Sequence, residues 1–376
     1  MSRSFERLSP YVGKALGLSE EALAQAYRPA RESEIPQILG LRHSVDREMW
    51  WDDDSFVRWR YFSRRTESGE STYWVFVRDG EVLGACGMEP VTLVVDGTAM
   101  PAVRTLDIMV RPDLDGLGLG VFMNLMLFRH FPITLVTGSN ERSHALLTRM
   151  FHHTTDLRFW KAPLRARAVI DGKVALGPVG RILALPGDLF LTIRRSLSRV
   201  LPPAGVAIRE TSEFDADVVA LSRRCESPGR VIVRRSDEYL NWRFVRNPRC
   251  QYRIFGAFAD GRLEGYLVTR LNLARPNPRR EGEIVDWLAA PVSDPRASVL
   301  PALVQAGVDG LIRDGAGIVT CAAAAPDLST AMAATGFRFR PLERLPFFVR
   351  AADPALHSRL CSSEDWFLTR GDLDVE

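Results

Sequence analysis

Three alternate glycines, Gly116, Gly118 and Gly120, stand between two apolar runs in the first half of the chain. The run before them has the character of a strand and the run after them that of a helix, so we expect a strand, a short turn and a helix. At such a turn several backbone N–H groups can point toward one place, with the positive end of the helix dipole behind them. The glycines therefore predict a pyrophosphate-binding site, with a purely structural turn as the alternative.

A second segment with chemical potential is a short aromatic and acidic run that contains Trp50, Trp51 and Asp52. Aromatic faces beside carboxylates can bind a sugar or a cationic amine. The alternative is structural, because an apolar residue ahead of an acidic helix start forms a hydrophobic staple. His152 and His153 have no companions at the spacing of metal ligands, so we predict no metal site.

The composition limits the class of protein. A chain of 376 residues is long for one hydrophobic core, which favours two domains. The formal net charge is +3, from nearly balanced acidic and basic residues, so we do not expect a nucleic-acid-binding protein. The five cysteines are scattered, as is typical of reduced thiols, and the first residues lack the apolar core of a secretory signal. We therefore expect a cytoplasmic protein.

The chain contains an internal repeat, in which three short motifs occur twice in the same order and at similar spacing. The pairs are FVRWRY (56–61) with YLNWRF (239–244), VFVRDGEVLG (75–84) with FGAFADGRLEG (255–265), and LDIMVRP (106–112) with VDWLAAP (285–291). The second pair predicts a hairpin with an Asp-Gly turn in each copy. The Trp-Arg dipeptide of the first pair is expected to pack its Trp on the sheet and to pair its Arg with a carboxylate. A tandem duplication explains all three matches.

Each copy follows the same expected plan: an opening strand, helical segments, a three-strand meander, a helix, a buried strand, a helix and a closing strand. This plan predicts the α/β class (an α+β mixed sheet flanked by helices), with two tandem domains. The expected helices are 34–47, 53–63, 117–128 and 141–150 in the first copy and 213–224, 236–245, 298–313 and 328–334 in the second. The expected parts of the chain are an N-terminal helical extension (1–25), a first domain (26–162), a linker (163–204), a second domain (205–352) and a C-terminal tail (353–376).

The linker contains an amphipathic segment, 187–201, with apolar residues on one helical face and arginines on the remainder. A basic amphipathic helix of this kind can lie on an anionic membrane surface. We favour the alternative, a strap that packs one domain against the other.

The repeated plan and the run VRPDLDGLGLG (110–120) resemble the GCN5-related N-acetyltransferase (GNAT) superfamily, over about 27–160 and 205–350. In that family, backbone amides of a glycine-rich loop hold the pyrophosphate of acetyl-CoA. The resemblance therefore implies two tandem GNAT-like domains, the first of which binds acetyl-CoA or another acyl-CoA as cosubstrate. It implies an N-acyltransferase, most simply an N-acetyltransferase, whose acceptor is a small amine or amino-sugar that attacks the thioester directly.

The resemblance also implies site residues. Asp107 and His144 are the catalytic candidates, because the attacking amine must lose its proton and the family often places a base where Asp107 stands. Asp286 takes the equivalent place in the second copy, so a structural carboxylate remains the alternative. The residues implied for cofactor binding are Met109, Val110, Asp115, Gly116, Leu117, Gly118, Leu119, Gly120, Asn140 and Ser143.

Other positions complete this set of implied roles. The backbone N–H of Val110 is the candidate donor to the thioester oxygen. Trp50, Trp51 and Asp52 lie where the family binds acceptors. An ordinary helix N-cap is the alternative for Asn140.

The sequence departs from the family at three places. Asp115 stands where the family has Arg or Gln, and Asp113 is close, so two carboxylates would repel a pyrophosphate unless they point outward or cap the helix. Leu147 stands near the position of a tyrosine that often serves as general acid. The second copy's loop, 290–297, has two prolines and no glycine, and prolines lack the N–H that an anion would need. We therefore expect the second copy not to bind CoA in the usual way.

Two other functions stay open. One is a catalytically inactive tandem module for binding or assembly, which the departures favour. The other is an aminoacyl or acyl transferase of cell-wall or exopolysaccharide synthesis, a class that double GNAT layouts resemble. The sequence does not set the acceptor, the length of the acyl chain or the oligomeric state.

Overall fold

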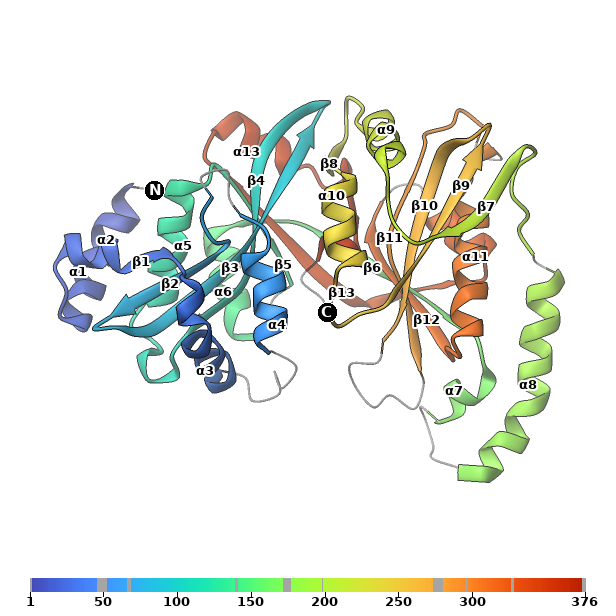
Figure 1. Cartoon of the computed structure of the whole chain (residues 1–376), viewed down its shortest axis with the longest axis horizontal. Helices are drawn as coiled ribbons and strands as arrows, with labels where there is room; N and C mark the ends of the chain where they lie inside the picture. The colour runs from blue at the N-terminus through green and yellow to red at the C-terminus, as the bar shows by residue number, and fades with distance from the viewer. Residues whose placement is uncertain are drawn as a thin grey trace. The chain divides into compact units, whose positions relative to one another are not determined.

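The structure is a computed structural model that describes residues 2–45, 53–65, 69–138, 141–171, 177–197, 199–272, 280–294, 297–325 and 328–373. The chain divides into two compact units (Figure 1). Unit 1 comprises 1–92, 100–154 and 347–362, and unit 2 comprises 93–99, 155–346 and 363–376. Each unit is therefore assembled from segments that are far apart in the sequence.

Unit 1 is built on a mixed sheet in the strand order β1-β2-β3-β4-β5-β13. β1, β2 and β3 pair in antiparallel fashion, β4 and β5 are parallel, and β13 returns antiparallel to β5. The strands are β1 (Tyr27–Pro29), β2 (Tyr73–Arg78), β3 (Glu81–Val95), β4 (Thr98–Val110), β5 (Ile133–Thr137) and β13 (Arg338–Ala351), whose residues 347–351 belong to this unit.

Helix α5 is the central helix of unit 1. Its sequence is apolar nearly all round, which is typical of a buried helix, and Phe122, Met123 and Leu127 lie in one core cluster with Phe76 of the sheet. The other helices are α1 (Ser2–Leu16), α2 (Glu20–Ala26), α3 (Ile35–Val45), α4 (Asp54–Val57), α5 (Leu119–His130), α6 (Glu141–Met150) and α13 (Pro354–Leu360). The α1 helix joins the same core cluster through its buried Val12.

Unit 2 repeats the plan, with the strand order β6-β12-β11-β10-β9-β7. Only the β11–β12 pair in this series is parallel. The strands are β6 (His152–Pro163), β7 (Val206–Thr211), β8 (Val231–Val233), β9 (Tyr252–Ala259), β10 (Arg262–Leu271), β11 (Glu281–Ala289), β12 (Ile318–Ala324) and β14 (Trp366–Thr369). The helices are α7 (Ala166–Asp171), α8 (Gly177–Leu197), α9 (Ala216–Cys225), α10 (Asp237–Leu240), α11 (Leu300–Arg313) and α12 (Leu328–Ala334).

The repeated motifs have the same structure in both units. The Asp79-Gly80 and Asp260-Gly261 turns both have two residues at positive φ, as a type I′ hairpin requires. Each Trp-Arg dipeptide lies in a short π-helical turn, Arg58–Phe62 or Asn241–Val245. Both Trp side chains are buried, and the predicted Arg–carboxylate pair is confirmed in unit 1, where Arg60 lies 3.3 Å from Glu89.

The closing strands differ from the sequence plan. Strand β6 follows the helices of the first copy, yet it pairs with β12 in unit 2. Strand β13 follows the second copy, and its residues 347–351 pair with β5 in unit 1. The expectation that each copy closes with its own strand is therefore wrong. The partner of a closing strand is decided by long-range packing, which local sequence patterns do not contain.

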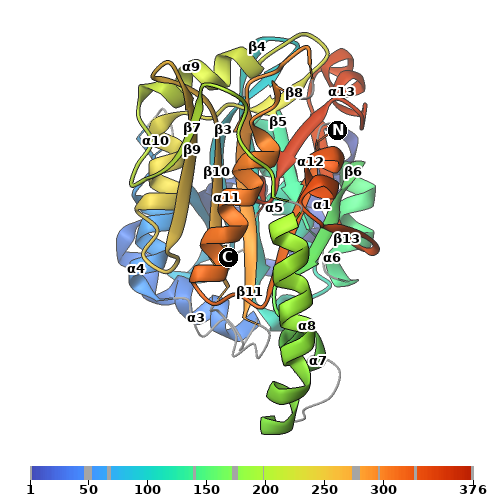
Figure 2. The ribbon, with the colours of Figure 1, turned by 90° about the vertical axis from the view of Figure 1, so that its right-hand side faces the viewer.

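The linker forms α7 and α8, and Figure 2 shows α8 along its length. The apolar side chains of α8 are exposed, among them Leu189, Phe190 and Ile193. Whether this face packs against the other unit, as the favoured strap would, is not tested, so the strap stays a prediction. Among the described residues, no helix combines the length and the apolar character needed to cross a bilayer.

Candidate functional site

The glycine turn has the geometry that the sequence predicts. A short 3-10 turn, Pro112–Leu114, leads into Gly116 and Gly118, which have φ angles of +82° and +78°. Gly118 caps the N-terminus of α5, and the first helical hydrogen bond runs from the Phe122 amide to the Gly118 carbonyl. The amides of Leu119, Gly120 and Val121 therefore have no acceptor within the helix, and this end of α5 can accept an anion.

The two carboxylates of the loop are held in different ways. Asp113 makes a two-point contact with Arg111, at 2.7 and 3.0 Å, so its charge is neutralised. Asp115 accepts a hydrogen bond of 3.0 Å from the Gly116 amide. The Leu117 amide donates to the Leu114 carbonyl. Two of the amides implied for pyrophosphate binding are thus engaged within the loop, and the available donors are those of the first turn of α5.

One side of the glycine turn is covered by the N-terminal helix. A Cβ atom placed on Gly118 would lie 3.1 Å from Leu8 and 3.7 Å from Val12, both on α1. The loop side chains Leu114 and Leu117 pack in the same apolar cluster. The close approach of α1 and the positive φ both require glycine at position 118.

The strands beside the loop separate, which exposes part of the β4 edge. Parallel pairing of β4 with β5 extends from Val103 opposite Thr134 to Thr105 opposite Val136. β4 itself continues to Val110, so its residues 106–110 extend beyond the paired part of β5. The predicted residues Met109 and Val110 lie on this stretch, and the Val110 side chain lies next to Gly120. A substrate arm can form backbone hydrogen bonds with this part of the edge.

Asp107 lies on the same stretch, in a left-handed conformation with φ of +48°. Arg42 donates a 2.8 Å hydrogen bond to its carboxylate, and the Tyr61 hydroxyl donates to the same oxygen. Arg42 also contacts the Tyr73 hydroxyl, at 3.3 Å. Burial works to raise the pKa of Asp107, but the Arg42 charge and the Tyr61 hydrogen bond outweigh it and lower the pKa below its ordinary value. The carboxylate is therefore ionised and a weak proton acceptor.

Arg42 and Tyr61 were not among the residues predicted from the sequence, although each stands out in the sequence. In α3 the buried residues Ile35, Ile38 and Arg42 follow the spacing of one helical face, so an arginine occupies an apolar stripe. Tyr61 stands where the second copy has Phe244. A hydroxyl that is present in one copy and absent from the other is a candidate functional group, and the alignment of the two copies shows this difference.

The other predicted site residues that the structure describes, His144 and Ser143, lie on helix α6. His144 is exposed on α6, with its ring 5.9 Å from that of Phe348, and Ser143 precedes it on the same helix. Asn140 and the acceptor candidates Trp50, Trp51 and Asp52 lie outside the described residues. Within the part of the chain that the structure describes, no group of three His, Cys, Asp or Glu side chains is placed to hold a metal ion.

The equivalent loop of unit 2 differs at the start of its helix. Helix α11 begins at Leu300 with proline in its first turn, and Pro301 occupies the second helical position, as Gly120 does in α5. Proline removes one of the donors that an anion would need at this end. That the second copy does not bind CoA in the usual way stays a prediction, and this proline supports it.

The strand gap of unit 2 contains the chain's own C-terminal segment. β11–β12 pairing extends from Glu281 to Ile284 on β11, and farther along β12 the residues Ala323 and Ala324 pair with β14. A short 3-10 turn, Arg370–Asp372, follows β14. A Cβ atom on Gly371 would lie 2.9 Å from that of Asp286, so this turn lies directly against the aspartate.

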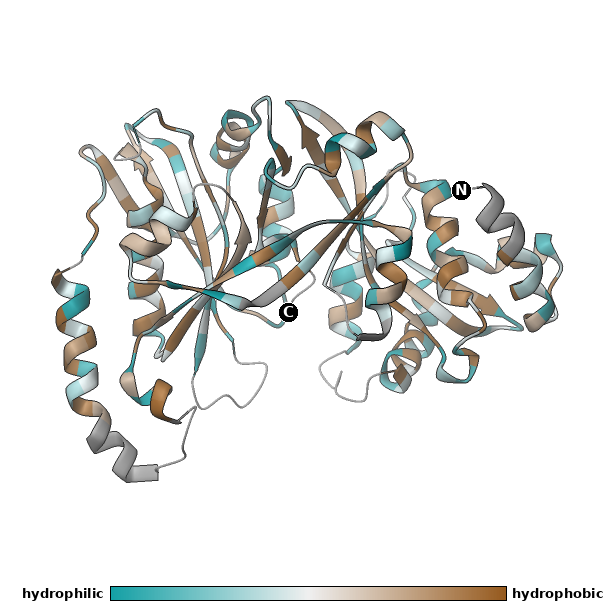
Figure 3. Cartoon of the chain, turned by 180° about the vertical axis from the view of Figure 1, so that it is seen from behind, coloured by the Kyte–Doolittle hydropathy of each residue, from teal (hydrophilic) through white to brown (hydrophobic). Residues whose placement is uncertain are grey.

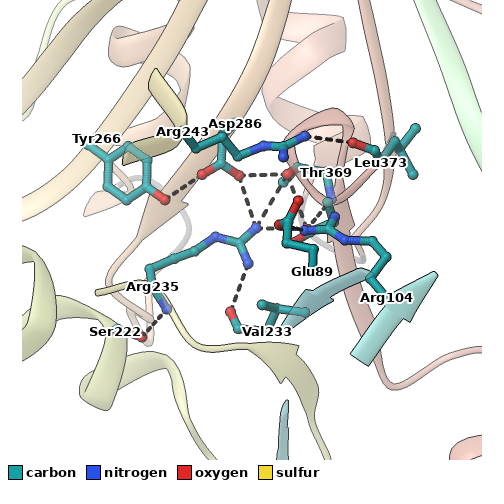
Figure 4. Close-up of polar contacts among 11 residues, drawn as sticks. Glu89, Arg104, Ser222, Val233, Arg235, Arg243, Tyr266, Asp286, Thr369 and Leu373 are labelled. Carbon is teal, nitrogen blue, oxygen red and sulfur yellow. Dashed lines mark hydrogen bonds and ion pairs between the residues drawn. The ribbon is translucent and has the colours of Figure 1, made fainter. Parts of the chain in front are cut away.

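Asp286 is buried in unit 2, and Figure 4 shows its polar contacts. Its carboxylate accepts hydrogen bonds from Arg235 at 2.9 Å, Thr369 at 2.6 Å and Tyr266 at 2.7 Å. The Asp286 side chain is 1% exposed, whereas that of Asp107 is 16% exposed. The two equivalent aspartates thus both bind an arginine and a tyrosine hydroxyl, but only Asp107 retains access to solvent.

Known proteins resemble this chain in fold and not in sequence. No protein-family model matches the chain, and no curated protein matches its sequence. Among solved structures, a GCN5-related N-acetyltransferase from Anabaena variabilis has a TM-score of 0.58 and 12% identity, over 87% of this chain and 72% of that chain. Saccharomyces cerevisiae N-myristoyltransferase with bound myristoyl-CoA has a TM-score of 0.56 and 12% identity, over 86% and 82%. A GCN5-related N-acetyltransferase from Kribbella flavida has a TM-score of 0.52 and 13% identity, over 87% and 71%. The predicted fold is confirmed: the chain has the GNAT fold over most of its length.

Proposed function

We propose that this chain, which has the GNAT fold, is an acyl-CoA-dependent N-acyltransferase and that unit 1 binds the acyl-CoA. The first turn of α5 carries the proposal: it presents open amides beside two positive-φ glycines, next to a strand edge that has separated from its neighbour. The similar structures support the same class, since two are GCN5-related N-acetyltransferases and one is an N-myristoyltransferase with bound myristoyl-CoA.

In this proposal the chain's residues bind and orient the two substrates. The amides of Leu119, Gly120 and Val121 hold the pyrophosphate. The edge of β4 from 106 to 110 aligns the pantetheine arm, and the Val110 amide donates to the thioester oxygen. Acyl-CoA supplies an activated thioester, whose C–S bond breaks as the C–N bond to the acceptor amine forms.

For Asp107 we propose a role in orientation. Its lowered pKa makes it a poor base, so it holds the Tyr61 hydroxyl and attracts the cationic form of an amine. His144 stays a candidate for the proton acceptor. The acceptor in this proposal is a small amine or amino-sugar, and an acetyl group is the simplest acyl chain.

The experiment that tests the proposal uses two substitutions of one residue. Gly120→Pro removes one open amide without breaking a helical hydrogen bond, and Pro301 shows that the fold accepts proline at this position. Gly120→Ala keeps the amide, and its Cβ would meet Val110 at an ordinary 3.6 Å. Affinity is measured by isothermal titration with acetyl-CoA and with a long-chain acyl-CoA. Gly120→Pro should bind at least about tenfold more weakly than the wild type, and Gly120→Ala should bind with near wild-type affinity. Equal affinity of the two variants, or no binding by the wild type, would overturn the proposal.

The main competing function is an inactive binding module, which the engaged amides of Gly116 and Leu117 and the absence of a tyrosine at Leu147 favour. A thiol assay that measures CoA release with a pool of amines separates the two. Release above background requires an enzyme, whereas binding without release supports the module. An aminoacyl transferase that uses charged tRNA is less favoured, because the near-neutral composition offers no broad basic surface.

A further inference from the structure

The exposed apolar side chains of the protein are concentrated on one helix. Twelve large apolar side chains are exposed in the described residues, and five of them lie on α8. They are Leu185, Leu189, Phe190, Ile193 and Leu197, with exposed fractions from 50% to 83%. Hydrophobic segments recur along α8 in Figure 3. A patch of this kind marks an interaction surface, whereas scattered exposed residues do not.

These side chains share one face of α8. Leu185, Leu189, Ile193 and Leu197 are spaced four residues apart, and Phe190 lies beside Leu189. Residues at this spacing stack on one side of a helix. The face is therefore a continuous apolar stripe over more than three helical turns.

The opposite face of α8 is fixed to unit 2 by specific contacts. The Asp188 carboxylate accepts a 2.5 Å hydrogen bond from the Ala166 amide, and Arg195 donates a 3.0 Å hydrogen bond to the Leu164 carbonyl. Ala184 is buried on the same side. These contacts set the rotation of the helix about its axis, so the apolar stripe points away from the unit that holds the helix.

The charge around the stripe is strongly positive. The segment 163–203 contains seven basic residues and two acidic ones, which gives it a formal charge of +5 in a chain whose total is +3. Arg194 and Arg199 are exposed. One of the two acids, Asp188, is already bonded to the Ala166 amide. The ligand of this face must therefore be apolar where it meets the stripe and negative around it.

We propose that α8 binds the surface of an anionic lipid bilayer, with its apolar stripe among the acyl chains and the exposed Arg194 and Arg199 at the headgroups. An amphipathic helix with a basic polar face binds such a surface through both contributions. A second copy of the chain is a poorer occupant, because a twofold interface would place two segments of charge +5 against each other. The surface would hold the enzyme at a membrane independently of the chemistry in unit 1.

The test is sedimentation of the full chain with vesicles of phosphatidylcholine alone and with vesicles that contain about one third phosphatidylglycerol. The wild type should bind the anionic vesicles, and the Leu189→Gln/Ile193→Gln variant should lose about tenfold or more in partition coefficient. The matched control is Val245→Gln/Val292→Gln, which replaces two exposed apolar residues elsewhere and should bind as the wild type does. Arg199→Glu should weaken binding and reduce its dependence on salt.

Three outcomes would overturn the proposal. The first is equal binding of the Leu189→Gln/Ile193→Gln variant and the wild type. The second is the absence of any preference for anionic over neutral vesicles. The third is a wild-type dimer in light scattering that the Leu189→Gln/Ile193→Gln variant converts to a monomer, because self-association would then account for the face. None of these outcomes depends on whether the acyl-CoA proposal holds.

Discussion

Glu89 accepts a hydrogen bond from Arg104 on the adjacent strand of unit 1 (Figure 4), and the equivalent pair of unit 2 has its charges exchanged. Arg270 on β10 and Glu283 on β11 are direct cross-strand neighbours, with 2.7 Å between Nε and Oε2. Glu89 and Arg270 both lie nine residues after the glycine of the hairpin. The duplicated sheet therefore preserves a buried ion pair at one site while its acidic and basic members change places.

Removal of one member of this pair should strongly destabilise unit 1. Arg104→Met would leave the buried Glu89 with its longer contact to Arg60, at 3.3 Å, and loss of one partner of a buried pair costs about 3–5 kcal/mol. Arg111→Met, which removes an exposed arginine, should cost about 1 kcal/mol or less. Urea unfolding of both variants measures the difference.

The exchanged pair provides the decisive control. Because Arg60 also contacts Glu89, the exchange is made with Arg60→Met. If geometry at this site accepts either order of charges, Glu89→Arg with Arg104→Glu in this background should recover much of the stability that Arg104→Met loses. An exchanged variant as unstable as Arg104→Met would show that the two orders are not interchangeable in unit 1.

The elements with regular local patterns were predicted well from the sequence. The expected helices 141–150 and 328–334 match α6 and α12 at both ends, and the expected 298–313 differs from α11 by two residues at its start. The glycine turn was also predicted, because closely spaced glycines favour a turn. Regular helices and short turns depend on residues that are near in sequence.

Features that depend on distant partners were not predicted. The tail at 353–376 contains α13 and β14, and β14 is four residues long. A strand this short is stable only because β12 and β8 flank it. The partners of Asp107 were missed for the same reason, since Arg42 lies sixty-five residues before it.

The two equivalent aspartates should respond differently to the same substitution. Asp107→Asn should lower kcat/KM for the amine about tenfold or more, because it removes the charge that attracts the acceptor. Asp286→Asn should leave turnover unchanged and lower the free energy of unfolding by about 2–4 kcal/mol, because three donors around it lose a buried anion. Kinetics and urea unfolding on both variants separate these effects.

The pH profile of Asp107→Asn tests the assigned role. If the residue orients the amine, the profile keeps its shape while its height falls. Loss of the acidic limb would instead identify Asp107 as the proton acceptor, contrary to our proposal.

Alanine at Gly118 should destabilise unit 1 more than alanine at another left-handed glycine. Gly118→Ala strains a residue at φ +78° and brings its Cβ to 3.1 Å from Leu8, whereas Gly205, at φ +77°, has nothing within 4 Å of that position. The left-handed conformation alone costs about 1–2 kcal/mol in each variant. The excess for Gly118→Ala, measured by thermal unfolding, reports the contact between α1 and the loop. Adding Leu8→Ala should remove that excess, and equal losses at both glycines would contradict the contact.

The stability of unit 1 should fall as the pH is lowered through about 6.5, the ordinary pKa of histidine. His357 on α13 accepts a 3.2 Å hydrogen bond from the Ala351 amide through Nδ1, and burial, with the charges of His152 and Arg350, lowers the pKa of His357. Between the lowered pKa and the ordinary value, the unfolded chain therefore binds a proton more readily than the folded chain. The free energy of unfolding decreases as the pH falls through that window.

His357→Ala should cost about 1 kcal/mol at neutral pH, through loss of the hydrogen bond, and should flatten the decrease in the free energy of unfolding. Thermal unfolding between pH 5 and pH 8 measures both effects, with the exposed His43→Ala as the control. An unchanged slope in His357→Ala would assign the acid sensitivity to another group.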